Sequence, residues 1–197
     1  MRERVERKQH ITKEFDNKEE FELNWVEASA HPIGAVGLWN SMIKIIKMAK
    51  EKGDDIIVIC EDDHYFTENY SPKLLFKEVT EAYIQGAEVL SGGIGGFGQA
   101  IPAGYHRYKV DWFWCTQFIV IYNRFFDKML DYSFQNTDTA DGVISKLATN
   151  IMVIYPFISE QKDFGYSDVT QSNMEQQGKI REHFARANKH MKSISLK

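Results

Sequence analysis

The stretch that most constrains the fold is an apolar run that ends in three consecutive acids. Residues 56–60 read Ile-Ile-Val-Ile-Cys, and Glu61, Asp62 and Asp63 follow directly. A short run of β-branched residues predicts a buried central strand of an α/β sheet. The acids then stand at the carboxyl end of that strand, where α/β sheets bind ligands in the crevice outside the strand ends. The sequence therefore predicts a ligand site at residues 61–63, the acidic cluster.

Two interpretations of the acidic cluster remain open at this stage. Adjacent carboxylates repel one another, so a folded chain accommodates them most easily with a bound cation. Hard oxygen ligands at this density suit Mg²⁺ or Mn²⁺, and the coordination of such ions is commonly completed by substrate phosphates. The alternative is a solvated acidic turn that follows the strand without binding a metal.

The overall composition argues against several classes of protein. A chain of 197 residues that is 43% hydrophobic and 26% charged is predicted to form one domain, residues 1–197, with a sizeable core. The formal net charge of -4 argues against broad nucleic-acid binding. The charged opening, Met1-Arg2-Glu3-Arg4, is no signal segment, and no apolar run is long enough to cross a bilayer. These features predict a cytoplasmic location.

Cysteine and tryptophan residues give a second set of expectations. Cys60 and Cys115 lie in apolar, strand-like runs, which predicts reduced core residues in preference to a disulfide or a catalytic thiol. Aromatic residues make up 13% of the chain, which fits a large buried core and also fits stacking on a base or a sugar ring. The tryptophans are Trp25, Trp39, Trp112 and Trp114.

Periodicity predicts a strand, a helix and a second strand around the acidic cluster. Residues 21–28 alternate between apolar and polar, which is the period of a strand. Residues 35–52 carry apolar side chains at helical spacing, and Gly53 is placed to end that helix in the left-handed conformation. Together with the run at 56–60, this pattern predicts two parallel strands joined by a right-handed crossover.

Further along the chain, the pattern predicts alternating helices and strands. Ser71 and Pro72 open a helix that runs to about Gln85. The other predicted strands are residues 87–91, 112–122 and 151–155, and the other predicted helices are residues 124–130 and 143–148.

A glycine-rich segment at residues 92–98 contains the spacing G-x-G-x-x-G. The dinucleotide-binding motif of that form requires a helix immediately afterwards, and the sequence here continues without one, so we reject that interpretation. A loop that closes over a ligand and a plain surface loop both remain open.

The two ends of the chain are strongly charged. Residues 2–18 predict a surface helix whose arginines are solvated, although one of them could reach a phosphate. Residues from about 175 to 197 predict a basic helix, with six Lys or Arg against one acid between 179 and 197. Its apolar face is Ile180, Phe184, Ala187 and Met191. This helix either caps the core with a solvated basic side or makes a peripheral contact with anionic lipid at the inner face of the membrane.

The order of these pieces resembles the family 25 glycosyltransferases, enzymes of the lipopolysaccharide-biosynthesis type with the GT-A fold. The resemblance covers most of residues 1–170. Two features of the family differ here: an apolar strand ahead of the arginines has no counterpart, and a Ser-His pair in the first helix is replaced by Asn40-Ser41. The matching residues are Arg2-Glu3-Arg4, Glu27-Ala28, Gly34-Ala35-Val36-Gly37, Glu61-Asp62-Asp63, Asp138 or Asp141, Tyr155-Pro156, Gln161 and Ser167-Asp168.

The resemblance implies a GT-A-like three-layer α/β/α sandwich with a mostly parallel central sheet, lacking the first strand of the family. It implies a metal-dependent hexosyltransferase that moves a sugar, with inversion, from a nucleotide-sugar, a UDP-sugar, to a glycan or a lipid-linked glycan of lipopolysaccharide or capsule. Glu61 and Asp63 would be the outer acids of its Asp-x-Asp motif. They would hold Mn²⁺ or Mg²⁺ against the donor diphosphate.

The resemblance also assigns roles to individual residues. Asp141 and Asp138 are candidates for the general base that accepts the proton of the acceptor hydroxyl, and helix capping is the alternative for each. His64 is a candidate metal ligand or phosphate contact, or merely a surface neighbour of the acids. The candidate donor contacts are Glu27, Asn40, Lys44, Asp62, Gln161, Ser167 and Asp168.

Two other functions are weighed against the transferase. A nucleotidyltransferase can also place carboxylates at a strand end, but it usually opens with a Gly-rich segment containing Lys or Arg that grips a triphosphate. No such start is visible in the sequence. The second alternative is a non-catalytic relative that binds a nucleotide or a sugar. Whether UDP binds in a metal-dependent way distinguishes this relative from the transferase.

Overall fold

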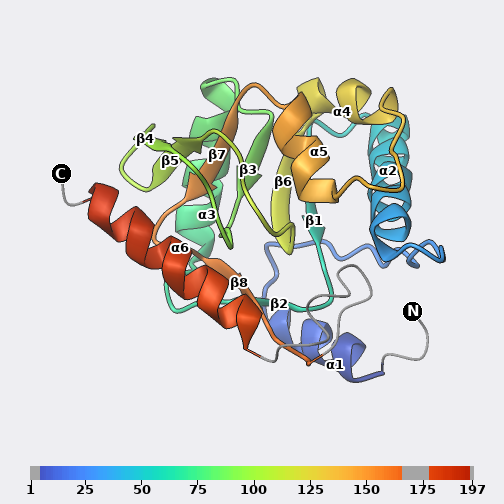
Figure 1. Cartoon of the computed structure of the whole chain (residues 1–197), viewed down its shortest axis with the longest axis horizontal. Helices are drawn as coiled ribbons and strands as arrows, with labels where there is room; N and C mark the ends of the chain where they lie inside the picture. The colour runs from blue at the N-terminus through green and yellow to red at the C-terminus, as the bar shows by residue number, and fades with distance from the viewer. Residues whose placement is uncertain (1–4, 166–177, 196–197) are drawn as a thin grey trace.

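The computed structural model describes residues 5–165 and 178–195 and arranges their helices on both faces of a sheet (Figure 1). Within these residues, the large sheet has the strand order β1-β6-β3-β7-β5-β4, and β2 pairs with β8 in a second sheet. The strands are β1 Ile56–Cys60, β2 His64–Phe66, β3 Val89–Ser91, β4 Ala100–Pro102, β5 Arg107–Val110, β6 Phe118–Tyr122, β7 Ile151–Ile154 and β8 Ser159–Gln161. The helices are α1 Val5–Glu14, α2 Gly34–Lys52, α3 Pro72–Ile84, α4 Asn123–Leu130, α5 Ala140–Leu147 and α6 Lys179–Ser195.

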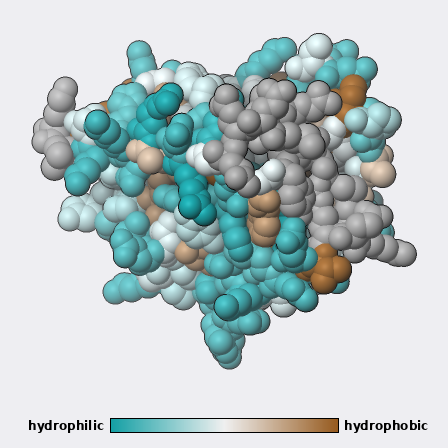
Figure 2. Space-filling view, turned by 60° about the horizontal axis from the view of Figure 1, so that its bottom comes forward, coloured by the Kyte–Doolittle hydropathy of each residue, from teal (hydrophilic) through white to brown (hydrophobic). Residues whose placement is uncertain are grey.

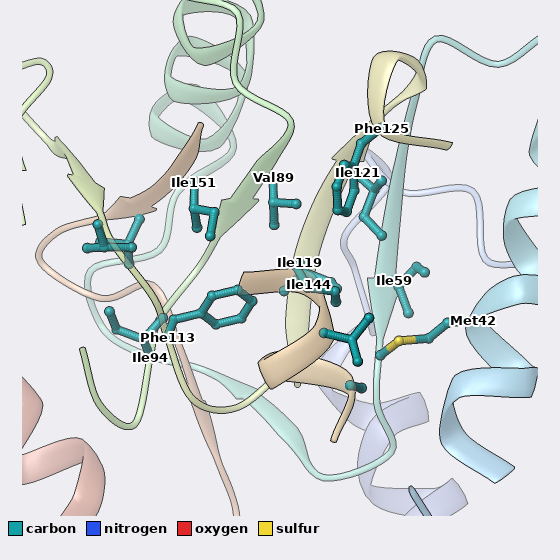
Figure 3. Close-up of a cluster of buried hydrophobic side chains, with 14 of the residues drawn as sticks. Met42, Ile59, Val89, Ile94, Phe113, Ile119, Ile121, Phe125, Ile144 and Ile151 are labelled. Atoms are coloured by element: carbon teal, nitrogen blue, oxygen red, sulfur yellow. The ribbon is translucent and has the colours of Figure 1, made fainter. Parts of the chain in front are cut away.

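The core is divided between the two faces of the large sheet. Successive side chains of a strand point to opposite faces, so Ile119 and Ile121 of β6 join one cluster, while Val120 joins the other. The first cluster packs against α2, α4, α5 and α6, and Figure 3 shows part of it, including Met42 of α2 and Ile144 of α5. The second packs against α1 and α3. The predicted α/β/α sandwich is confirmed.

The large sheet is mixed. β1, β3, β4 and β7 run in the same direction, and β5 and β6 run in the opposite direction. Because the two reversed strands lie between the others, β3 and β7 are the one parallel pair of neighbours among the described strands. The carboxyl ends of β1, β3 and β7 therefore meet at one edge of the sheet, the lower edge in Figure 1. Figure 2 brings that edge forward, and the coloured residues there are mostly hydrophilic.

Two predictions about strand positions are wrong. β1 is an edge strand that pairs with β6 alone, and its Ile56 and Val58 are 36% and 37% exposed, so it is not a buried central strand. Residues 21–28 form an irregular segment, so the predicted parallel pair does not form. Phe21 instead packs against the rings of Phe15 and Phe66, at centroid distances of 5.1 and 6.0 Å. An alternating pattern becomes a strand only where a neighbouring strand supplies its hydrogen bonds.

The predicted ends of α2 and α3 are confirmed. Gly53 ends α2 with φ 76°, the left-handed conformation that glycine adopts readily. The Ser71 hydroxyl accepts a hydrogen bond from the backbone N–H of Leu74 at 3.2 Å, and Pro72 is the first residue of α3. Both signals are local in sequence, so they act whatever the helix later packs against.

The basic C-terminal helix forms as α6, with Phe184, Ala187 and Met191 buried against the core. Its lysines and arginines lie mainly on the exposed side, as the capping alternative describes. Contact of that side with lipid stays a prediction. Among the described residues, no helix is long and apolar enough to span a membrane.

A buried ion pair links β5 to α3. The guanidinium of Arg107 binds the carboxylate of Glu78, and both side chains are fully buried. Arg107 also donates to Glu81 at 3.3 Å and to the carbonyl of Ala103 at 3.3 Å. These bonds tie the β4–β5 side of the sheet to the helix beneath it, and neither charge can be left alone without a large desolvation cost.

We expect Arg107→Met to lower the free energy of unfolding by about 3–5 kcal/mol, because it leaves Glu78 buried without its cation. Adding Glu78→Leu should restore much of the loss. Lys50→Met is the matched control, since its ion pair with Asp127 is exposed and is worth at most about 1 kcal/mol. Urea unfolding measures all four proteins, and equal losses from Arg107→Met and Lys50→Met would contradict the prediction.

Candidate functional site

The acidic cluster lies where the chain leaves β1 and turns toward β2. The turn is closed by a hydrogen bond from the backbone N–H of His64 to the carbonyl of Glu61, at 3.2 Å. The backbone N–H of Glu61 still pairs with the carbonyl of Gln117, at 3.0 Å, so the cluster begins at the last rung of the β1–β6 ladder. The acids therefore stand at the carboxyl end of β1, as predicted from the sequence.

Asp63 is held by two segments that are distant in sequence. Arg7 of α1 donates to Asp63 Oδ2 at 3.2 Å and to Asp62 Oδ1 at 2.7 Å, and Gln161 of β8 donates to Asp63 Oδ2 at 2.8 Å. Asp63 Oδ1 is buried and has no hydrogen-bond partner among the described residues. Burial raises the pKa of Asp63, although Gln161 and Arg7 oppose the rise. Arg7 is 5% exposed, so its prediction as a solvated residue is wrong.

Glu61 has several acidic neighbours. Its Oε1 accepts a hydrogen bond from the hydroxyl of Thr116 at 2.6 Å. Burial and the nearby charge of Asp63, with smaller contributions from Asp62 and Asp141, raise the pKa of Glu61 to about 8. Acidic neighbours thus add to the effect of burial on the pKa of Glu61, and cation binding by the acidic cluster stays a prediction.

The structure separates the two candidate bases. Asp141 lies at the site: its Oδ2 accepts from the backbone N–H of Cys115 at 3.1 Å, and its charge acts on Glu61. Asp138 instead holds the preceding loop, where its Oδ2 accepts from the Tyr132 hydroxyl at 3.1 Å and from the backbone N–H of Gln135 at 2.8 Å.

The N-cap of α5 is neither of these acids. It is Thr139, whose hydroxyl accepts from the backbone N–H of Gly142. Asp141 also accepts a hydrogen bond from that N–H, at 2.8 Å, from inside the first turn of the helix.

The predicted donor contacts divide into three groups. Asp62 and Gln161 are in the site through Arg7 and Asp63. Glu27 is exposed in the irregular segment before α2, and Asn40 and Lys44 are exposed on α2, so their role as donor contacts stays a prediction. Ser167 and Asp168 lie outside the described residues.

His64 belongs to the core and is not a surface neighbour of the acids. Its side chain is fully buried, with ring centroids 4.3 Å from Phe66 and 4.9 Å from Phe118. Its Nδ1 lies 2.7 Å from the hydroxyl of Ser159. Burial lowers the pKa of His64 to about 3, so the ring is neutral at physiological pH. His64 of β2 thus contacts Ser159 of β8 on the buried side of the small sheet.

The glycine-rich segment is neither a lid nor a surface loop. Residues 92–95 are buried, and the backbone N–H of Gly92 donates to the carbonyl of Phe118 at 3.0 Å. A Cβ on Gly93 would lie 1.9 Å from the carbonyl oxygen of Ser159. The glycines therefore let the chain pass through the interior directly behind the site, which is a packing requirement that the sequence motif does not reveal.

Thr116 and Gln117 were not predicted as site residues, although Thr116 donates to Glu61 and Gln117 lies buried next to it in the chain. The Gln117 side chain is fully buried and donates to the carbonyl of Gly93 at 2.9 Å and to the Ser159 hydroxyl at 3.2 Å. The signal that could have identified both is two polar residues inside a strongly apolar run, because a buried polar side chain requires partners.

Glu61 and Asp63 could supply two of the ligands of a metal ion. Among the described residues, no group of three or more His, Cys, Asp or Glu side chains is arranged to hold a metal ion. Mg²⁺, however, is commonly held by one or two carboxylates, with water and substrate phosphates completing its shell. Glu61, with its raised pKa, and Asp63, with its unpartnered Oδ1, are the oxygen donors that fit this arrangement.

Comparison with known proteins gives only distant similarities. No protein-family model and no curated protein matches the chain. Among solved structures, apo UDP-glucose pyrophosphorylase is similar with 10% identity and a TM-score of 0.44, covering 78% of this chain and 61% of that one. UDP-glucose pyrophosphorylase complexed with UDP-glucose is similar with 10% identity and a TM-score of 0.48, covering 94% of this chain and 74% of that one.

We expect Gly93→Ala to destabilise the protein by about 1–3 kcal/mol or more, because the added Cβ meets backbone that cannot move aside. Gly98→Ala is the comparison, since its added Cβ would meet the side chains of Asp111 and Trp112 at 2.6 Å and not backbone, and it should cost less than Gly93→Ala. Thermal and urea unfolding distinguish the two variants. Similar losses would show that the interior path of the glycine-rich segment is not what requires Gly93.

Proposed function

We propose that this chain is a metal-dependent glycosyltransferase that moves a sugar from a nucleotide-sugar, a UDP-sugar, to a glycan or lipid-linked glycan acceptor of a surface polysaccharide. One observation carries the proposal: Glu61 and Asp63 stand together at the carboxyl ends of the strands, with a buried Asp63 oxygen that no hydrogen-bond donor satisfies. The resemblance to the family 25 glycosyltransferases supports the same assignment of these two acids.

Glu61 and Asp63 would hold Mn²⁺ or Mg²⁺, which supplies Lewis-acid stabilisation to the leaving diphosphate when bound. The protein positions both acids: Thr116 fixes Glu61 through its hydroxyl, and Gln161 fixes Asp63. Arg7 contributes a guanidinium at the same place, and such a group also pairs well with phosphate oxygens. The diphosphate would therefore meet positive charge at the edge of the sheet.

Asp141 is the general base in this proposal. Its carboxylate is anchored by the backbone N–H groups of Cys115 and Gly142, at 3.1 and 2.8 Å, and lies close enough to act electrostatically on Glu61. It would accept the proton of the acceptor hydroxyl as that oxygen attacks the anomeric carbon of the donor, an inverting displacement. Asp138 has no such place, because it is committed to its own loop.

The alternative is a non-catalytic protein that binds a nucleotide or a sugar. One observation favours it: Arg7 already pairs with Asp62 and Asp63, so an internal cation stands where a metal ion would otherwise supply positive charge. In that case a nucleotide would bind through Arg7, without a metal.

We expect calorimetric titration to show that UDP binds in the presence of Mn²⁺ and binds weakly or not at all after its removal. Asp63→Asn should lower the affinity for UDP with Mn²⁺ by about 10- to 100-fold or more, because it removes a metal ligand while keeping the shape of the side chain. Asp131→Asn is the matched control, since Asp131 is exposed at the end of α4. Its affinity should match that of the wild type.

The two candidate functions give different results in this titration. Metal-independent binding of UDP that survives Asp63→Asn but is lost in Arg7→Gln would favour the non-catalytic alternative. Failure of UDP to bind under any condition would count against the transferase and against a nucleotide-binding protein, and would leave sugar binding as the remaining alternative.

We expect Asp141→Asn to slow the release of UDP from a UDP-sugar by about 10²–10⁴-fold, because it removes the proton acceptor. UDP affinity should change little, since the diphosphate ligands remain. Asp138→Asn keeps its activity if the assignment is correct, and a larger loss in Asp138→Asn than in Asp141→Asn would reverse it. The measurement is a coupled assay of UDP formation with UDP-glucose and UDP-galactose as donors.

A further inference from the structure

Trp114 presents a half-exposed indole and directly precedes the two residues that contact Asp141 and Glu61. Its side chain is 48% exposed. The two residues that follow contact the site directly: the backbone N–H of Cys115 donates to Asp141, and the Thr116 hydroxyl donates to Glu61. Two residues of chain extend at most about 7 Å, so the backbone of Trp114 lies within that reach of the two residues that contact the acids.

The position of the indole is fixed by its surroundings. The backbone of Trp114 pairs with Gly96, donating from its N–H to the Gly96 carbonyl at 3.0 Å. A Cβ on Gly96 would lie 2.7 Å from Cε3 of the indole, so the ring packs directly on the glycine. The rings of Trp112 and His183 flank it, with centroids at 5.3 and 5.6 Å. One part of the indole is thus supported by protein while the rest stays exposed.

We propose that Trp114 is the platform for the acceptor sugar: the apolar face of a pyranose ring stacks on the exposed indole, and its hydroxyls point toward Asp141 and Glu61. This inference rests on the proposed function and specifies the acceptor contact of the same site. A large exposed aromatic ring that is already immobilised gains affinity from burial without a large loss of side-chain entropy.

The neighbouring groups favour a neutral sugar over a nucleobase carrying a diphosphate. Glu61 and Asp141 are hydrogen-bond acceptors, which match the hydroxyl donors of a sugar. The diphosphate of a nucleotide stacked here would approach the Asp141 carboxylate, which repels it unless a metal ion lies between them. A pyranose has an apolar face of C–H groups for the indole and a rim of hydroxyls for the acids, so both halves of the surface are used.

The test is saturation-transfer NMR at millimolar concentrations of four methyl pyranosides, those of glucose, galactose, mannose and N-acetylglucosamine. We expect at least one to receive saturation from the wild-type protein, and its affinity to fall by at least about fivefold in Trp114→Ala. Trp114→Phe, which keeps an aromatic ring, should lose less. Phe76→Ala is the matched control, because Phe76 is also exposed but lies on α3, on the other side of the sheet.

Three results would overturn the inference. They are the absence of binding by all four glycosides, glycoside binding that Trp114→Ala and Trp114→Phe leave unchanged, and Trp114-dependent binding of uridine in place of the glycosides. UDP titration of Trp114→Ala distinguishes this failure from that of the proposed function. Metal-dependent UDP binding that persists without Trp114-dependent glycoside binding removes the platform alone, whereas absence of UDP binding in the wild type removes the proposed function.

Discussion

The carboxylate of Asp63 is the contact through which three parts of the chain are held together at the site. It follows β1, it accepts from Arg7 of α1, and it accepts from Gln161 of β8. A buried carboxylate without such partners costs several kcal/mol. The hydrogen bonds from Arg7 and Gln161 therefore hold α1 and β8 against the end of β1, and they also oppose the rise in the pKa of Asp63 that burial causes. The position of the acidic cluster and the position of the small β2–β8 sheet therefore depend on each other.

A second polar network lies directly behind the first. The Ser159 hydroxyl contacts His64 Nδ1 at 2.7 Å and accepts from Gln117 at 3.2 Å, and Gln117 also donates to the carbonyl of Gly93. These bonds link β2, β8 and the segment after β3, although His64 Nε2 and Gln117 Oε1 have no hydrogen-bond partner among the described residues. The close approach of Gly93 to Ser159 is part of the same arrangement, which explains why small residues are needed between β3 and the site.

Local signals in the sequence were sufficient for the helices and for the acids. Ser71 and Gly53 mark helix ends by hydrogen bonds and backbone conformation within a few residues, so their effect is readable without knowledge of the fold. The place of β1 in the sheet is different, because an apolar strand at an edge and one at the centre share a composition. The burial of Arg7 cannot be predicted from its own segment for a related reason: a charged residue in a surface helix becomes buried only when a distant acid forms an ion pair with it.

The choice between Asp138 and Asp141 shows the same limit. Both precede or begin α5, and spacing alone assigns capping or catalysis to either. The loop geometry gives the two acids different surroundings: Tyr132 and Gln135 donate to Asp138, Thr139 is the cap, and Asp141 accepts from Cys115.

The distribution of positive charge bears on the choice between the two functions. Arg7 pairs with Asp62 and Asp63, whereas Glu61 is bound by the neutral hydroxyl of Thr116. A protein that bound its ligand through Arg7 alone would have no use for a third acid whose pKa is raised by burial and by its neighbours. A divalent cation between Glu61 and Asp63 would use that acid and the unpartnered oxygen of Asp63 together. This asymmetry favours a metal-dependent site over binding through Arg7 alone.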